Sequence, residues 1–305
     1  MAITLTQVSK VYGKQKALDQ VSFTLQEGQI CGFLGPNGAG KSTTMKIITG
    51  YLTDFQGDVN ISDIDIRQQP LEAKKRIGYL PEHNPLYPDM YICEYLLHVA
   101  RLYHIPHARQ KVDDIIAQTG LTPEAGKKIG QLSKGYRQRV GLAQALVHDP
   151  EVLILDEPMT GLDPNQLEEI RNLIVRTSRN KTVLLSTHIM QEVEAICDRV
   201  MIINQGKIIA DKSIHEFRSA SGNQMVISVR FAAGTDSTWL SKSALFKDIK
   251  QITAESWLLT SQPTEDPRVA LFRQAAEYNC PIIELKTEEY HLEEVFHSLT
   301  RNEVV

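Results

Sequence analysis

A glycine-rich segment near the N-terminus has the composition of a phosphate-binding loop (P-loop). It follows the short apolar run 30–34 and opens a stretch with helical character that ends near Gly50. Glycines let backbone N–H groups close around phosphate oxygens, and a helix N-terminus adds positive partial charge. We expect Lys41 to reach the β- and γ-phosphates of a nucleotide, and Ser42 to ligate Mg²⁺. The residues assigned to this loop are Gly35, Pro36, Asn37, Gly38, Ala39, Gly40, Lys41, Ser42 and Thr43.

Two adjacent carboxylates supply the second half of the predicted site. Asp156 and Glu157 directly follow the apolar run 152–155, which is typical of a buried strand. Ligands bind at the carboxyl ends of the strands in open parallel sheets, so these acids are expected beside the P-loop. Asp156 is suited to hold Mg²⁺, directly or through water, and Glu157 to act as the base that polarises the attacking water. The two motifs together predict Mg²⁺-dependent hydrolysis of a nucleoside triphosphate.

A histidine ends the next apolar run along the chain. His188 follows the run 182–185 by three residues, at the expected end of a strand. A neutral imidazole at this position is able to hydrogen-bond a γ-phosphate and to orient the attacking water. The alternative is a polar residue at a strand end without a chemical role, and we keep that interpretation for the other histidines. His188 is assigned to the catalytic site because it accompanies the two motifs above.

The elements that position these residues alternate between short apolar runs and helical patterns up to about residue 218. Continuous apolar runs of this kind are typical of a parallel sheet that is covered on both faces. The candidate strands are residues 30–34, 152–155, 182–185 and 200–203. Between about residues 84 and 149 the strand signal disappears, and apolar residues recur with helical spacing. The predicted fold class is α/β, a P-loop NTPase core with an inserted helical subdomain.

A second, smaller domain is predicted after a small polar linker at residues 219–223. Its candidate elements are strands at 225–231, 256–259 and 281–285 and a helix at 267–278. A final amphipathic helix is expected to present on one face Leu292, Val295, Phe296 and Leu299. The predicted organisation is therefore a nucleotide-binding domain at 1–218 and a C-terminal accessory α+β domain at 224–305.

Composition excludes several classes of protein. The net charge of -4 argues against a protein that works mainly by coating nucleic acid or anionic lipid. Apolar residues nowhere form a run of eighteen or more, so no helix of this chain is expected to span a bilayer. The four cysteines are scattered without a close pair, as expected of reduced thiols in the cytosol, and the N-terminal residues do not resemble a signal peptide. Any membrane role is therefore expected to come through a partner.

Two further motifs resemble those of a known family. Residues 132–139 read Leu-Ser-Lys-Gly-Tyr-Arg-Gln-Arg and resemble the signature motif of ABC ATPases. Residues 161–163, Gly-Leu-Asp, resemble the D-loop of the same family. Together with the P-loop and the acidic strand end, the resemblance covers residues 1 to about 215 in the family's order of motifs. It implies that the domain at 1–218 is an ABC-type ATP-binding domain and that its cofactors are ATP and Mg²⁺.

The resemblance also implies an assembly in which two ATPase subunits meet head to tail. Each signature motif then caps the ATP held by the opposite P-loop through Ser133 and Gly135, and Asp163 of the D-loop belongs to the same set of nucleotide-binding residues. Serine is a good helix N-cap, and a glycine backbone approaches a phosphate closely, so the residue types agree with this role. Tyr12 occupies the position of the family's adenine-stacking aromatic. The alternative for Tyr12 is a hairpin tyrosine that packs on its neighbours.

Three positions depart from the commonest pattern of the family. Glu82 stands where most members carry the Q-loop glutamine, and a carboxylate ligates Mg²⁺ as an amide does but adds negative charge. Lys134 and Tyr136 replace a glycine and a glutamine of the signature. These departures, and the ending 292–296, resemble ATPases that serve ABC-2 type exporters, including the drug, polysaccharide and gliding-motility branches.

Two alternatives to an exporter remain open. A basic cluster suggests nucleic acid, as in ABC ATPases that act on DNA or ribosomes; its members are Lys127, Lys128, Lys134, Arg137 and Arg139. Those relatives typically carry long coiled-coil insertions or two fused ATPase units, which this chain lacks, so a solvated helix face is the favoured explanation. An importer ATPase is the nearer alternative. We expect a cytoplasmic, peripheral ATPase that forms a homodimer, or a pair with a related subunit, and drives a membrane-spanning permease.

Overall fold

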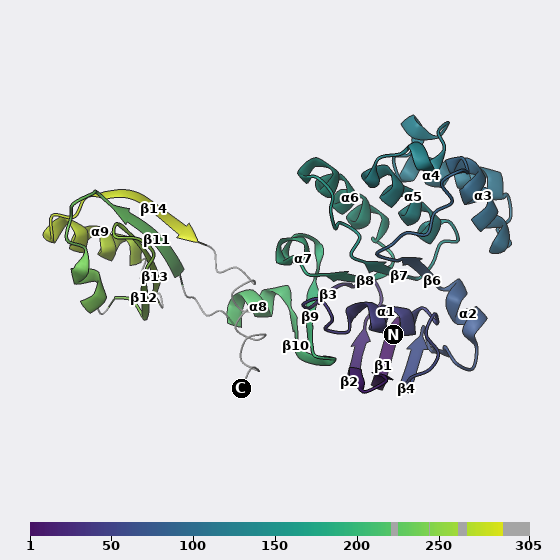
Figure 1. The fold of residues 1–305 in the computed structure, drawn as a ribbon, viewed down its shortest axis with the longest axis horizontal. Helices are drawn as coiled ribbons and strands as arrows, with labels where there is room; N and C mark the ends of the chain where they lie inside the picture. The colour runs from purple at the N-terminus through teal and green to yellow at the C-terminus, as the bar shows by residue number, and fades with distance from the viewer. Residues whose placement is uncertain (221–224, 244, 262–266, 289–305) are drawn as a thin grey trace. The chain divides into compact units, whose positions relative to one another are not determined.

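The computed structural model describes residues 1–220, 225–243, 245–261 and 267–288, and it divides into two compact units (Figure 1). The first unit comprises Met1–Ile214 and the second His215–Val305. This division falls a few residues before the boundary predicted at 218, because most of helix α8 (Ile214–Ala220) belongs to the second unit. Each unit has its own hydrophobic core.

A six-stranded sheet forms the centre of the first unit. Its strands, in order across the sheet, are β10 (Lys207–Ser213), β9 (Arg199–Asn204), β3 (Ile30–Leu34), β8 (Thr182–Thr187), β7 (Val152–Asp156) and β6 (Ile77–Leu80). The strands from β9 to β6 run parallel, and β10 is antiparallel to β9. β7 and β8 are buried along their whole length, which is why their sequences are continuous apolar runs. The four strands predicted from such runs are confirmed, and their ends differ by at most two residues.

An antiparallel sheet lies on the other side of helix α1 (Lys41–Ile48). Its strands, in order, are β2 (Gln15–Leu25), β1 (Ile3–Tyr12), β4 (Gln56–Ile61) and β5 (Ile64–Asp65). The buried Met45 and Ile48 of α1 form one core with residues of both sheets, so the helix is sandwiched between them (Figure 1). The pairing of β1 with β2 shifts register at three places. The shift between Leu5 and Val8 moves the buried residues of β1 from odd to even positions, so sequence periodicity does not indicate this sheet.

Helices fill the segment between β6 and β7, where the sequence predicts a helical subdomain. They are α3 (Ile92–Leu102), α4 (Ala108–Gln118), the 3-10 turns η1 (Thr122–Glu124) and η2 (Ile129–Gln131), and α5 (Lys134–Leu146). Leu96 of α3 and Val112 of α4 are fully buried, as their helical spacing predicts. α5 begins directly after Ser133, whose side chain accepts a 3.3 Å hydrogen bond from Tyr136 N. Ser133 therefore caps the helix that carries the signature motif.

Three more helices connect strands of the first unit. They are α2 (Pro70–Lys75), which precedes β6, α6 (Pro164–Thr177), which precedes β8, and α7 (Met190–Ile196), which precedes β9. Asp163 caps α6, because its carboxylate accepts a 2.9 Å hydrogen bond from Gln166 N. α7 packs so closely on β3 that a Cβ on Gly32 would lie 2.9 Å from Cγ1 of Val193.

The second unit is a small α+β domain, as the sequence predicts. Its antiparallel strands, in order, are β12 (Asp248–Gln251), β13 (Ser256–Ser261), β11 (Met225–Phe231) and β14 (Ile282–Glu288), accompanied by η3 (Thr238–Lys242) and α9 (Pro267–Glu277). Its core combines Val229, Trp257 and Leu271, which come from two strands and α9. The amphipathic helix predicted over 292–299 lies outside the described residues. No helix in the described part of either unit has the length and apolar character needed to cross a membrane.

Candidate active site

The P-loop connects β3 to α1, and two of its glycines adopt backbone angles that other residues rarely take. Gly38 has a φ of 79° and Gly40 a φ of 114°. A Cβ on Gly40 would also lie 2.8 Å from the carbonyl oxygen of Ala17. Because α1 begins at Lys41, these glycines turn the chain directly from a strand into a helix N-terminus. The unpaired N–H groups of that first turn are able to receive phosphate oxygens.

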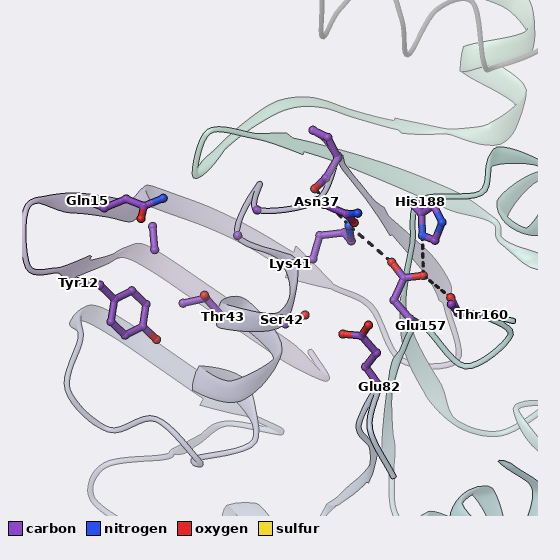
Figure 2. Close-up of a pocket in the computed structure, with 14 residues that line it drawn as sticks. Tyr12, Gln15, Asn37, Lys41, Ser42, Thr43, Glu82, Glu157, Thr160 and His188 are labelled. Atoms are coloured by element: carbon purple, nitrogen blue, oxygen red, sulfur yellow. Dashed lines mark hydrogen bonds and ion pairs between the residues drawn. The ribbon is translucent and has the colours of Figure 1, made fainter. Parts of the chain in front are cut away.

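A cavity of about 680 Å³ lies over this loop (Figure 2). Its lining consists of Tyr12, Gln15, Ala17, Pro36, Asn37, Gly38, Gly40, Lys41, Ser42, Thr43, Glu82, Glu157, Thr160 and His188. The structure therefore brings together most residues of the predicted P-loop with the predicted base, the histidine, Tyr12 and Glu82. Gly35 and Ala39 lie outside this lining, since a Cβ on Gly35 would be 2.4 Å from the carbonyl oxygen of Ile203. They form the back of the loop.

Lys41 lies in the middle of the cavity with its ammonium group fixed by the protein. Its Nζ donates hydrogen bonds to the carbonyl oxygens of Gly35 at 2.6 Å and of Pro36 at 3.3 Å. It also lies 3.6 Å from Oε1 of Glu157, and both side chains are only 7% exposed. Water screens this charge weakly, so the ammonium is a strong point charge for binding phosphate.

The carboxylate of Glu157 is oriented from both sides. Its Oε2 accepts a 2.9 Å hydrogen bond from Oγ1 of Thr160 and lies 2.9 Å from Nδ1 of His188 (Figure 2). Its backbone N–H donates to the carbonyl oxygen of Ser186 at 3.1 Å, which ties the end of β7 to β8. Glu157 thus presents a fixed acceptor for a proton at the wall that faces the P-loop, as a general base requires. Nothing in the sequence pattern singled out Thr160.

Asp156 is buried just behind this wall. Its Oδ1 accepts hydrogen bonds from Oγ of Ser42, at 3.3 Å, and from Oγ of Ser186. Burial raises the pKa of Asp156, and the negative charges of Glu82 and Glu157 raise it further, although the two serine hydrogen bonds oppose this. A nearby cation would stabilise the ionised form of this carboxylate. Ser186 is a second residue that sequence reasoning missed.

The acidic groups fit a magnesium ion that is shared with a nucleotide. Glu82 follows β6 and points its carboxylate into the cavity, toward the space between Ser42 and Glu157 (Figure 2). In the described parts of the chain, no group of three or more His, Cys, Asp or Glu residues forms a metal site by itself. Mg²⁺ commonly binds through one or two carboxylates together with substrate phosphates and water. The oxygens of Ser42, Asp156 and Glu82 suit that kind of site.

Tyr12 lies at the end of the cavity that is remote from Glu157 (Figure 2). It pairs with Gln15 across the β1–β2 hairpin, and it is 47% exposed. The ammonium of Lys10 lies 5.0 Å from the ring centroid. An exposed aromatic in the lining suits stacking on a base, while the contact with Lys10 agrees with the alternative of a hairpin tyrosine that packs on its neighbours. Gln15 and Ala17 also line the cavity and were not found from the sequence.

Ser133, Gly135 and Asp163 lie outside the lining of this cavity. The signature segment and the D-loop pack on each other instead. A Cβ on Gly135 would meet the side chain of Gln166 at 2.9 Å, and one on Gly161 would meet Nζ of Lys134 at 2.3 Å. The structure thus does not bring these three residues to the nucleotide site of their own chain.

The carboxyl ends of β3, β7 and β8 place a P-loop, Glu157 and His188 around one cavity, with Asp156 buried behind Glu157, and this arrangement defines a P-loop nucleoside triphosphatase. Residues 18–160 match the family described as "ABC transporter". The linearmycin resistance ATP-binding protein LnrL of Bacillus subtilis (strain 168) is 31% identical over 300 residues, which cover 96% of each chain. The bacitracin transport ATP-binding protein BcrA of Bacillus licheniformis is 38% identical over 211 residues, which cover 68% of this chain and 69% of that protein.

Solved structures agree with these relatives. An ATP-binding subunit of an ABC transporter has a TM-score of 0.66 and 27% identity, over 73% of this chain and 94% of that chain. A dimeric bacterial ABC transporter cassette has a TM-score of 0.65 and 25% identity, over 70% of this chain and 98% of that chain. The chain belongs to the family of ABC transporter ATP-binding proteins, and it is the ATPase subunit of such a transporter.

Proposed function

We propose that this chain powers an ABC-2 type exporter of the drug-export branch by hydrolysing Mg-ATP between two copies of itself. The observation that carries the hydrolytic part is the orientation of Glu157, whose carboxylate lies among Lys41, Thr160 and His188. Support for the export branch comes from LnrL, whose similarity extends over 96% of this chain and so includes the C-terminal unit. BcrA, named for bacitracin transport, supports the same branch. These two relatives favour drug export over the gliding-motility branch.

The proposed reaction assigns one task to each polar group of the cavity. The P-loop N–H groups and Lys41 bind the phosphates, and Glu157 accepts a proton from the water that attacks the γ-phosphorus. Nδ1 of His188 donates to the carboxylate of Glu157, and a ring that carries protons on both nitrogens also donates from Nε2 to the γ-phosphate. Ser42, Asp156 and Glu82 would hold Mg²⁺, which neutralises charge on the β- and γ-phosphates when bound. Tyr12 stacks on adenine.

Two copies are required because the signature residues lie outside their own chain's cavity. In the proposed dimer, Ser133 and Gly135 of each chain cap the ATP that the other chain holds, and Asp163 lies at the same interface. The dimeric form of a similar cassette supports this assembly. Closure of the dimer is passed to a membrane-spanning permease through the helical subdomain, so we place the chain on the inner face of the cell membrane.

Purification and reconstitution test the transport direction. A tagged chain, expressed together with its candidate permease, is expected to copurify with that permease from detergent-solubilised membranes. Proteoliposomes with Mg-ATP supplied on the ATPase side are then expected to move bacitracin or linearmycin away from that side. Lys41→Ala is the control, because loss of the ammonium removes the phosphate contact and should stop transport. Movement toward the ATPase side would contradict export and would favour an importer ATPase.

Glu82 offers a separate test of the metal site. Glu82→Gln keeps an oxygen ligand and should retain most hydrolysis, whereas Glu82→Ala removes the ligand. We therefore expect Glu82→Ala to shift the Mg²⁺ concentration for half-maximal ATPase activity upward by about tenfold, and to weaken stimulation by the permease. The measurement is a Mg²⁺ titration of the parent and both variants, with and without the permease. Superimposable curves for Glu82→Ala and the parent would mean that Glu82 neither holds the metal nor carries the coupling.

A further inference from the structure

Strand β6 and helix α5 are packed backbone against backbone. A Cβ on Gly78 of β6 would lie 2.1 Å from the carbonyl oxygen of Ala145 in α5. A Cβ on Gly141 of α5 would lie 2.6 Å from Cδ1 of Leu80 and 1.9 Å from Nδ2 of Asn84. Because the two elements approach each other so closely, the strand and the loop that follows it have no room to slide over the helix. β6, this loop and α5 are therefore expected to move together.

Asn84 extends this contact to the signature end of α5. Arg137, Gly141 and Ala145 are spaced four residues apart and so share one face of the helix. The Nδ2 group of Asn84 lies over Gly141 and donates a 3.2 Å hydrogen bond to the carbonyl oxygen of Arg137. Arg137 belongs to the first turn of α5, which begins at Lys134. The amide of Asn84 thus joins the loop that carries Glu82 to the turn that follows Ser133.

Stability of the fold alone does not explain an asparagine at this position. The Oδ1 atom of Asn84 is buried and has no hydrogen-bond partner among the described residues. A buried acceptor without a partner costs free energy, which an apolar side chain of similar size would avoid. Asn84 therefore contributes two contacts to α5: its side chain fills the space over Gly141, and its amide donates one hydrogen bond to the helix.

We propose that Asn84 is a positioning residue that transmits occupation of the Mg-ATP site from Glu82 to the signature helix α5. The inference rests on the proposed function, in which Glu82 ligates Mg²⁺ and Ser133 caps the ATP of the second subunit. When the carboxylate of Glu82 moves to bind the metal, the loop at 81–84 moves with it. Because Asn84 is bonded to α5 and fills the space above Gly141, the first turn of α5 follows.

Hydrogen exchange in the Glu157→Gln background tests this coupling at protein concentrations where the chain is monomeric. In the parent, Mg-ATP is expected to slow amide exchange in residues 81–86 and in residues 134–140. Asn84→Ala should keep the protection of 81–86 and ATP affinity within about twofold, while the protection of 134–140 falls by about fivefold or more. Gly141→Ala should have the same effect, because its Cβ displaces the amide. The two substitutions together should lose no more than either alone.

His83→Ala is the matched control, since His83 is exposed and adjoins Asn84 in the same loop. It should leave both protections unchanged. Full protection of 134–140 in Asn84→Ala, with Mg²⁺-dependent protection of 81–86 present, would overturn the role of Asn84 and leave the proposed function intact. Equal loss in His83→Ala would also overturn it. Absence of Mg²⁺-dependent protection of 81–86 in the parent would instead contradict the metal role of Glu82, and the coupling would fall with it.

Discussion

Glu157→Gln is expected to lower ATP turnover by about 10²–10⁴-fold while ATP binding persists. The amide keeps the size of the side chain and an oxygen that accepts the hydrogen bond from Thr160, which in the parent is 2.9 Å long. It cannot accept a proton from the attacking water. The test combines turnover at saturating Mg-ATP with direct measurement of the dissociation constant for ATP. The expected result is a large fall in kcat with a dissociation constant that changes little.

Two controls separate loss of the base from loss of the site. Lys41→Ala should abolish nucleotide binding, because it removes the buried ammonium that is proposed to bind the phosphates. Glu168→Gln removes an exposed carboxylate from α6 and should leave turnover unchanged. Turnover of Glu157→Gln close to that of the parent would show that another group takes the proton.

Ser133→Arg is expected to prevent formation of the Mg-ATP dimer while sparing ATP binding by the single chain. In the Glu157→Gln background, Mg-ATP should convert the chain to a two-fold dimer, because a ligand held only by the closed form stabilises that form. Arginine removes the helix cap, at a cost of about 1 kcal/mol, and also places a long side chain where the second subunit must approach. Sedimentation velocity should show a dimer dissociation constant that rises by about 100-fold or more, equivalent to about 2.7 kcal/mol.

Ser133→Asp distinguishes the cap from the contact with ATP. Aspartate caps a helix as well as serine does, so α5 should keep its stability. Its negative charge would face the γ-phosphate of the opposite ATP, so the dimer should still be weakened. A Ser133→Arg chain that dimerises as the parent does would contradict the proposed role of the signature motif. Monomeric Glu157→Gln at saturating Mg-ATP would contradict the assembly itself, unless addition of the permease restores the dimer.

The parts of the fold that could be predicted are those in which one local pattern decides the structure. β7 and β8 are buried on both faces, so their apolar runs define them without knowledge of their neighbours. β1 could not be recognised in this way, because its buried side chains change from odd to even positions between Leu5 and Val8, where its register with β2 shifts. Recognising β1 requires knowledge of how it pairs with β2, and the pattern of apolar residues within one segment does not give that pairing.

The same distinction applies to the site. The P-loop and the acidic strand end are contiguous in sequence, and their chemistry is legible from residue type and order. Ser186 was missed because its role depends on the parallel register that sets it opposite Asp156. Gln15 is a common polar residue that reaches the cavity only when the chain folds, so its position is a consequence of tertiary structure. Thr160 contacts Glu157 only three residues away, and it was missed because its residue type carries no specific signal.

The backbone of Glu157 has a φ of 50°, in the left-handed region that residues with a Cβ seldom occupy. Holding a glutamate there costs on the order of 1 kcal/mol, which the rest of the domain has to supply. Glycine and asparagine tolerate this conformation more easily, and neither provides a carboxylate. Laboratory selection for heat resistance alone would therefore favour substitutions of Glu157 that abolish ATP hydrolysis. A thermostabilised library of this ATPase needs selection for turnover in every round.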